Sequence, residues 1–169
     1  ATTTKTPLNP GTVSSFPASS TVYTTTGDLT FGNGSTITVS DGISVVYLVD
    51  GNVTISQSLA LANPNTSFLA IIASGTISVA STITGSSANP GLDGVFLAGT
   101  FRDLEQTPPA SPHTPLFVRG LVAANTVTLL RDNADRSVPS DTFIYNPALP
   151  FTMPEWMKDL YYEWREVAP

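Results

Sequence analysis

Hydrophobic and polar positions along this chain follow a regular repeat with a period of ~24 residues. Residues 27–31 read Gly-Asp-Leu-Thr-Phe, and similar five-residue segments begin at Gly51, Gly75 and Gly99. A fifth copy, slipped slightly from the period, begins at Asn125, and Asn is the residue that best replaces Gly where φ is positive. A fixed period of this length is the signature of structural units that stack on one another.

Within each copy, apolar and hydroxyl side chains alternate. We call the first residue of each copy its anchor. The second residue after each anchor is apolar, and the residue after that is Thr or Ser in four of the five copies. Alternation with a period of two predicts a β-strand with its apolar side toward a core and its hydroxyls outward. The apolar positions, which we expect to stack in one buried column, are Leu29, Val53, Ile77, Phe101 and Val127.

Short strands and turns at a fixed period indicate an all-β fold. We predict a β-solenoid, that is, a single-stranded parallel β-helix of about four to five coils with a C-terminal cap that contains a helix. The sequence divides into a Thr/Ser/Pro-rich N-terminal arm (1–22), the solenoid (23–139) and the cap (140–169). Residues 152–155, Thr-Met-Pro-Glu, form a capping box that predicts the start of the helix.

A second strand precedes each anchor and is apolar on both faces. These segments are residues 45–49, 68–73, 95–98 and 121–124. A strand of this kind is buried on both sides, so a strip on the outside of the solenoid needs a cover, either from the chain's own ends or from another subunit. The side chains expected at this assembly interface are Tyr47, Val49, Ile71, Ala73, Val95, Leu97 and Leu121, with Trp156, Leu160 and Trp164 of the cap.

Composition narrows the classes of function. The net charge of −6 argues against nucleic acid as a partner. The chain has no cysteine, which excludes disulfides, iron–sulfur clusters and covalently attached haem, and it has no apolar run of roughly 18 residues that would span a membrane. Few charged residues, abundant Thr and Ser, and three sequons at Asn33, Asn52 and Asn65 favour an extracellular or cell-surface location.

Few residues suggest chemistry. His113 is the only histidine and lies in a Pro-rich segment that lacks the neighbours of a catalytic triad. The pairs Arg102–Asp103 and Arg131–Asp132 lie at different offsets from their anchors, so we expect the two pairs not to stack on each other. We expect them instead to form salt bridges in the loops. The dense Gly/Asp repeats of calcium-binding β-rolls do not occur. We therefore predict no catalytic residue, no metal site and no cofactor.

The coil length and the strand–turn pattern of residues 23–132 resemble those of the right-handed parallel β-helix proteins of the pectate-lyase-like superfold. The resemblance implies that, in an enzyme, stacked carboxylates and an Arg or Lys would act on one face. The chain is also similar in character to bacterial surface and pilus-associated solenoids, which implies a short β-helix placed on an exported stalk.

These observations favour a structural function. We expect a secreted or cell-surface subunit that self-associates into an extracellular filament through its N-terminal arm, so its main partner is a second copy of itself. One alternative is an adhesin-like module that binds glycan, which would be a monomer with an aromatic or Asn-lined groove. A second alternative is a polysaccharide lyase or hydrolase, which would require carboxylates clustered on one face.

Overall fold

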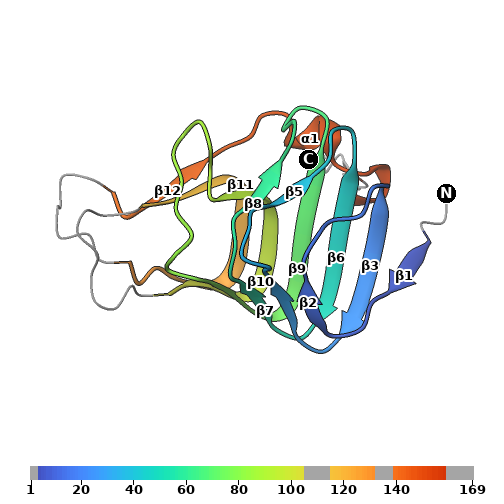
Figure 1. The fold of residues 1–169 in the computed structure, drawn as a ribbon, viewed down its shortest axis with the longest axis horizontal. Helices are drawn as coiled ribbons and strands as arrows, with labels where there is room; N and C mark the ends of the chain where they lie inside the picture. Colours follow the sequence, from blue (N-terminus) through green and yellow to red (C-terminus); the bar gives the residue numbers. More distant parts are fainter. Residues whose placement is uncertain (1–3, 105–114, 132–138, 159–169) are drawn as a thin grey trace, which may run out of the picture.

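The chain is a parallel β-solenoid of about four turns, with a short helix and a 3-10 turn near its C-terminal end (Figure 1). This computed structural model describes residues 4–104, 115–131 and 139–158. The predicted fold class is confirmed. The strands are β1 (Lys5–Pro7), β2 (Gly11–Val13), β3 (Thr21–Thr26), β4 (Leu29–Phe31), β5 (Ile37–Val39), β6 (Ser44–Asp50), β7 (Val53–Ile55), β8 (Leu59–Leu61), β9 (Phe68–Val79), β10 (Leu92–Asp103), β11 (Leu116–Thr128) and β12 (Asp141–Ile144).

Each coil contributes strands to parallel ladders that run along the solenoid. The longest ladder has the order β1-β3-β6-β9-β10-β11-β12, and its members β3, β6 and β9 lie side by side in Figure 1. A second ladder joins β2, β4, β7 and the C-terminal half of β9, and a third joins β5, β8 and β10. Every pair is parallel because each strand is separated from its neighbour by one complete coil.

The predicted column of apolar side chains is present. Leu29 pairs with Val53, Val53 with Ile77, Ile77 with Phe101, and Phe101 with Val127. The hydroxyl row beside it is also in register, since Thr30 pairs with Thr54 and Thr54 with Ser78. The period of the sequence therefore sets the register of the stack.

Most of the anchor glycines allow successive turns to stack closely and do not adopt a conformation that requires glycine. Gly27 has a φ of +118°, but Gly51, Gly75 and Gly99 do not have positive φ. A Cβ built on Gly51 would lie 2.6 Å from the carbonyl oxygen of Gly27, closer than carbon and oxygen can approach. Beside these glycines, the Asn52 amide N–H donates a 2.7 Å hydrogen bond to Asp28 Oδ1, which links two successive turns.

The N-terminal arm forms the first coil of the chain's own solenoid. β1 pairs with β3 and β2 pairs with β4, so strands begin well before residue 23. This coil is short, because Lys5 pairs with Val22 across fewer residues than separate Val22 from its next partner, Val46. The ring of Phe16 lies over the end of the core, 6.1 Å from the ring of Phe31 and 6.2 Å from that of Tyr47.

In the part of the cap that the structure describes, residues 139–158, the helical structure consists of two short turns. Helix α1 spans Leu149–Thr152 and a 3-10 turn, η1, spans Glu155–Met157. Neither is capped by a side chain, so the proposed capping box at residues 152–155 is wrong: Thr152 ends α1, and Pro154 keeps an extended backbone between the two turns. No helix among the described residues is long and apolar enough to cross a membrane.

Candidate functional site

An apolar strip does run along the outside of the solenoid, as predicted. It consists of side chains on β3, β6, β9 and β10 that point away from the main core, and we call it the outer strip. Its buried members are Val22, Val46, Phe68, Ala70 and Val95, and its partly buried members are Leu48, Ile72 and Leu97.

Four residues that the sequence assigned to this interface face the interior instead. Tyr47, Val49, Ile71 and Ala73 belong to the main core and are at most 5% exposed. The assignment was one residue out of phase, and in a strand a shift of one residue moves every side chain to the opposite face. A strand that is apolar on both faces carries no alternation from which the phase can be read.

The remaining predicted interface residues lie in several places. Val95 and Leu97 belong to the outer strip, and Leu121 is exposed on β11. Trp156, at the edge of the cap, lines a cavity of about 360 Å³ together with Val22 and Val46. Leu160 and Trp164 lie outside the described residues.

The chain covers part of the outer strip with its own cap. Leu149 of α1 is buried in the same cluster, and Met153 and Met157 pack against it. One of the two expected covers, the chain's own C-terminal end, is therefore in place. A second subunit is not needed over the covered part of the strip.

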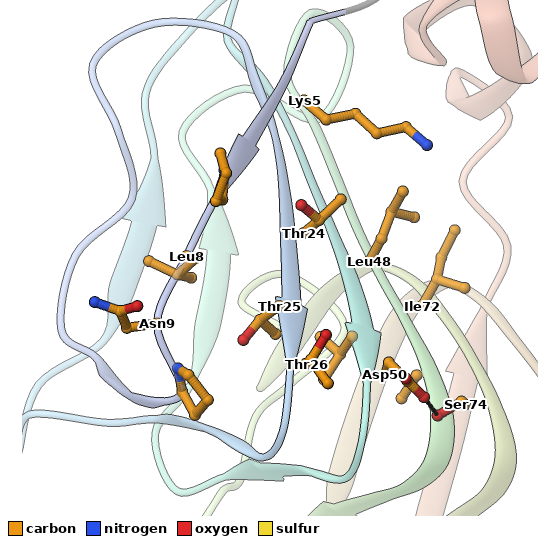
Figure 2. A pocket seen from close by; sticks show the side chains of 14 residues that line it. Lys5, Leu8, Asn9, Thr24, Thr25, Thr26, Leu48, Asp50, Ile72 and Ser74 are labelled. Atoms are coloured by element: carbon orange, nitrogen blue, oxygen red, sulfur yellow. Dashed lines mark hydrogen bonds between the residues drawn. The ribbon is translucent and has the colours of Figure 1, made fainter.

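Beside the covered part, an open groove of about 760 Å³ lies between the first coil and the outer face of the sheet (Figure 2). Leu48 and Ile72 of the outer strip, and Thr24 from the neighbouring strand, are among the residues that line it. Asp50 accepts a 3.0 Å hydrogen bond from Ser74 there, so the carboxylate links two coils. The groove combines apolar and hydroxyl groups without a cluster of reactive side chains among the residues that line it.

Two of the candidate charged residues do meet, contrary to the sequence prediction. Arg131 Nε lies 2.8 Å from Asp103 Oδ2, and Asp103 also accepts a 2.6 Å hydrogen bond from the Leu130 amide. Arg131 additionally donates to the carbonyl oxygens of Ile83 and Ala80, at 2.7 and 2.9 Å. This is a pairing inside the protein and not the trimming of a surface loop.

Asp141 completes this cluster, which we call the Asp103–Arg131–Asp141 cluster. Its Oδ1 lies 3.9 Å from Arg131 Nε, and all three side chains are at most 5% exposed. Burial raises the pKa of Asp141 to about 7, and the adjacent Asp103 carboxyl adds to the rise through a hydrogen bond and its charge. Arg131 only partly opposes this shift. The cluster joins the end of β10 to the start of β12.

A second ion pair, with a buried carboxylate and a partly buried guanidinium, lies on a different face. Asp93, 1% exposed, accepts two hydrogen bonds from the guanidinium of Arg119, the residue directly beside it in the ladder. The pair lines a cavity of about 370 Å³, together with Thr36, Ser58, Thr84 and Asn89 among others. Sequence reasoning missed this pair. Its signal was an Asp and an Arg separated by the length of the local coil, so that the two stack.

The remaining candidate residues are Arg102, His113 and Asp132. Arg102 belongs to the outward row of the ladder, where it pairs with Ser78 and Thr128. His113 and Asp132 lie outside the described residues. Within residues 4–104, 115–131 and 139–158, no group of three or more His, Cys, Asp or Glu residues is placed to hold a metal ion.

At the C-terminal end of the solenoid, two interior columns have no cover among the described residues. In the column of Leu29, Val53, Ile77 and Phe101, each side chain is at most 1% exposed, but the last member, Val127, is 49% exposed. A neighbouring column ends in the same way, because Phe143 follows Val118 and is 47% exposed. These side chains border an apolar cavity of about 370 Å³, lined by Val118, Gly120, Leu121, Val122, Val127, Phe143, Ile144 and Tyr145.

The two ends of the solenoid therefore differ. At the N-terminal end Leu29 is buried although only Gly11 precedes it in the ladder, because the short first coil and Phe16 close that end. At the C-terminal end, Val127 and Phe143 have no further coil above them among the described residues.

No family model, curated protein or solved structure matches this chain.

Proposed function

We propose that this protein is a structural subunit of the cell surface or extracellular space that self-associates through the C-terminal end of its solenoid. The observation that carries the proposal is the exposure of Val127 and Phe143 at the ends of interior columns. A solenoid needs a polar outer face at each terminal coil to remain soluble, and this end lacks one within the described residues.

Association would bury apolar surface that the isolated chain leaves in water. Full burial of a Val or Phe side chain contributes about 1.5–3 kcal/mol, and Leu121, Leu129 and Tyr145 are exposed at the same end. The polar side chains elsewhere are consistent with a structural role. The two ion pairs and the links from Asp28 and Asp50 each join one coil to another.

Assembly into a filament through the N-terminal arm remains a prediction. The arm would have to act from the outer edge of β1, because β1 and β2 are already paired within their own chain. The extracellular location also remains a prediction, which rests on the low charge, the abundant Thr and Ser and the sequons.

Sedimentation velocity over a range of concentrations tests the proposal. We expect the wild-type chain to associate reversibly and Phe143→Lys to sediment as a monomer. The matched control is Phe151→Lys, which makes the same change at an 83% exposed position on α1 and should associate like the wild type. Circular dichroism would check that both variants fold. A wild-type chain that is monomeric at the highest attainable concentration would refute the proposal.

A second candidate function, glycan binding, is favoured by the Asp93–Arg119 cavity. Asp93 occupies two guanidinium nitrogens and holds Arg119 in place beside hydroxyl and amide side chains. The cavity is close to the lower limit of typical ligand sites, and a neutral ion pair with hydroxyl neighbours suits a sugar residue better than an anion. Saturation-transfer NMR with methyl glycosides of glucose, galactose, mannose and N-acetylglucosamine tests this. We expect a signal that Asn89→Ala weakens, and the absence of any signal would exclude these sugars.

A further inference from the structure

We infer that the occupant of the open C-terminal end is the same end of a second copy, so that the chain forms a closed two-fold dimer. This inference rests on the proposed function, because it specifies how the chain self-associates. The observations that carry it are the unpaired edge of β11, the absence of charge on that edge and the short strands of the closed N-terminal end.

The edge of β11 is long and unpaired. β11 pairs with β10 along most of its length, but β12 pairs only with Leu116–Arg119. From Leu121 to Thr128, the outer edge of β11 therefore has no strand beside it among the described residues. Backbone N–H and C=O groups on such an edge are ready to pair with another chain.

This edge also lacks the features that prevent pairing. Residues 121–130 read Leu-Val-Ala-Ala-Asn-Thr-Val-Thr-Leu-Leu and contain no charged residue and no proline. Natural edge strands are usually protected by lysine, proline, a bulge or a very short length. In a chain of net charge −6, an uncharged edge is where two copies can approach with the least repulsion.

The N-terminal end is a poor partner for this edge. Its strands β1 and β2 are three residues long, and Pro7 ends the first of them. Proline offers no N–H group to a ladder, and short strands are themselves a protective feature. Head-to-tail stacking would therefore place a long edge against two short strands that Phe16 and the shortened coil already close.

Pairing of the C-terminal end with itself satisfies the edge on both copies. A two-fold axis perpendicular to the sheet reverses the strand direction, so the two β11 strands would run antiparallel and form a regular ladder. Such an interface is isologous and closes after two copies, whereas head-to-tail contact would continue into a filament. With the axis near Ala124 and Asn125, Leu121 of one copy lies opposite Thr128 of the other.

Cross-linking distinguishes the two arrangements. Because the chain has no cysteine, each single-cysteine variant carries only one reactive thiol. We would place cysteine on the β11 edge with Asn125→Cys and on the N-terminal edge with Thr12→Cys, both at exposed positions. A short bismaleimide tolerates small differences in register. We expect Asn125→Cys to give a covalent dimer, Thr12→Cys to stay monomeric, and an equal mixture to give no mixed product.

The other outcomes separate the inference from the proposed function. A covalent product that joins an Asn125→Cys chain to a Thr12→Cys chain would show head-to-tail association. In that case a chain with both substitutions would form a series of longer cross-linked oligomers. That result would keep self-association and overturn the two-fold dimer. No cross-link in any variant, with the wild type monomeric in sedimentation, would overturn both.

Discussion

Arg131 Nε donates a 2.8 Å hydrogen bond to the Asp103 carboxylate inside the solenoid, at a position that earlier coils fill with apolar side chains. In the ladder, Asp103 pairs with Val79, and the preceding members of that column are Ile55 and Phe31. The last member of this column is thus an ionised side chain in an ion pair, whereas the earlier members are hydrocarbon side chains. An ionised carboxylate in such a position requires a partner, and Arg131 supplies the charge.

Removal of one member of this pair should be costly. Asp103→Asn leaves the Arg131 guanidinium buried beside an amide, and loss of one partner from a buried pair typically costs about 3–5 kcal/mol. The free energy of unfolding from urea titration measures the effect. We expect the double variant Asp103→Leu/Arg131→Leu to lose less than Asp103→Asn, because it continues the apolar column. A double variant less stable than Asp103→Asn would show that the ion pair is not replaceable by packing.

The pKa of Asp141 predicts how stability depends on pH. The folded-state value is raised from 3.8 to about 7, so between these values the folded chain binds more protons than the unfolded chain. The stabilising contribution is complete below about pH 4 and is lost as the pH rises to about 7. Urea titrations at several pH values should show this decline in the wild type and a weaker decline in Asp141→Asn. Equal slopes in the two chains would contradict the assigned pKa.

The stacked column predicts a graded set of packing effects. Ile77→Ala removes a side chain with no exposed surface and should destabilise the chain by about 2–5 kcal/mol. Val127→Ala, in the same column but half exposed, should cost clearly less in a monomeric sample. Thr54→Ala, on the outward row, serves as the control. Similar losses for Ile77→Ala and Val127→Ala would mean that the end of the column is covered.

The close stacking of the turns predicts a specific sensitivity at the anchor glycines. In Gly51→Ala the new Cβ would meet the backbone carbonyl of Gly27 at 2.6 Å, and backbone cannot move aside cheaply. We expect a loss of about 1–3 kcal/mol, which is typical of overpacking. Gly32→Ala is the control, because its nearest neighbour is the Ser56 side chain at 3.2 Å. Thermal melts compare the two, and equal melting temperatures would contradict the packing argument.

The repeat made the fold predictable, because one period specified both the stacking and the register of Leu29, Val53, Ile77 and Phe101. The face of the doubly apolar strands was not predictable, since Tyr47 and Val46 are both apolar enough to be buried. Alternation is the only local signal for a strand face, and it fails where both faces are covered.

The Asp103–Arg131–Asp141 cluster could have been anticipated in part. Asp103 lies four residues after its anchor, at an interior position, and an Asp there requires a partner. The different offsets of Asp103 and Arg131 from their anchors did not predict that the two side chains meet. A long arginine side chain can reach a carboxylate from a different position in the next coil. The closure of the N-terminal end by Phe16 follows from tertiary contacts between coils, which local composition does not encode.

Hydrogen–deuterium exchange of the wild-type chain at low and high concentration tests the central claim most directly. If the open C-terminal end is the site of self-association, amides of residues 121–128 will exchange more slowly at high concentration, while those of β1 and β2 will not change. Exchange in residues 121–128 that is the same at both concentrations would contradict the account.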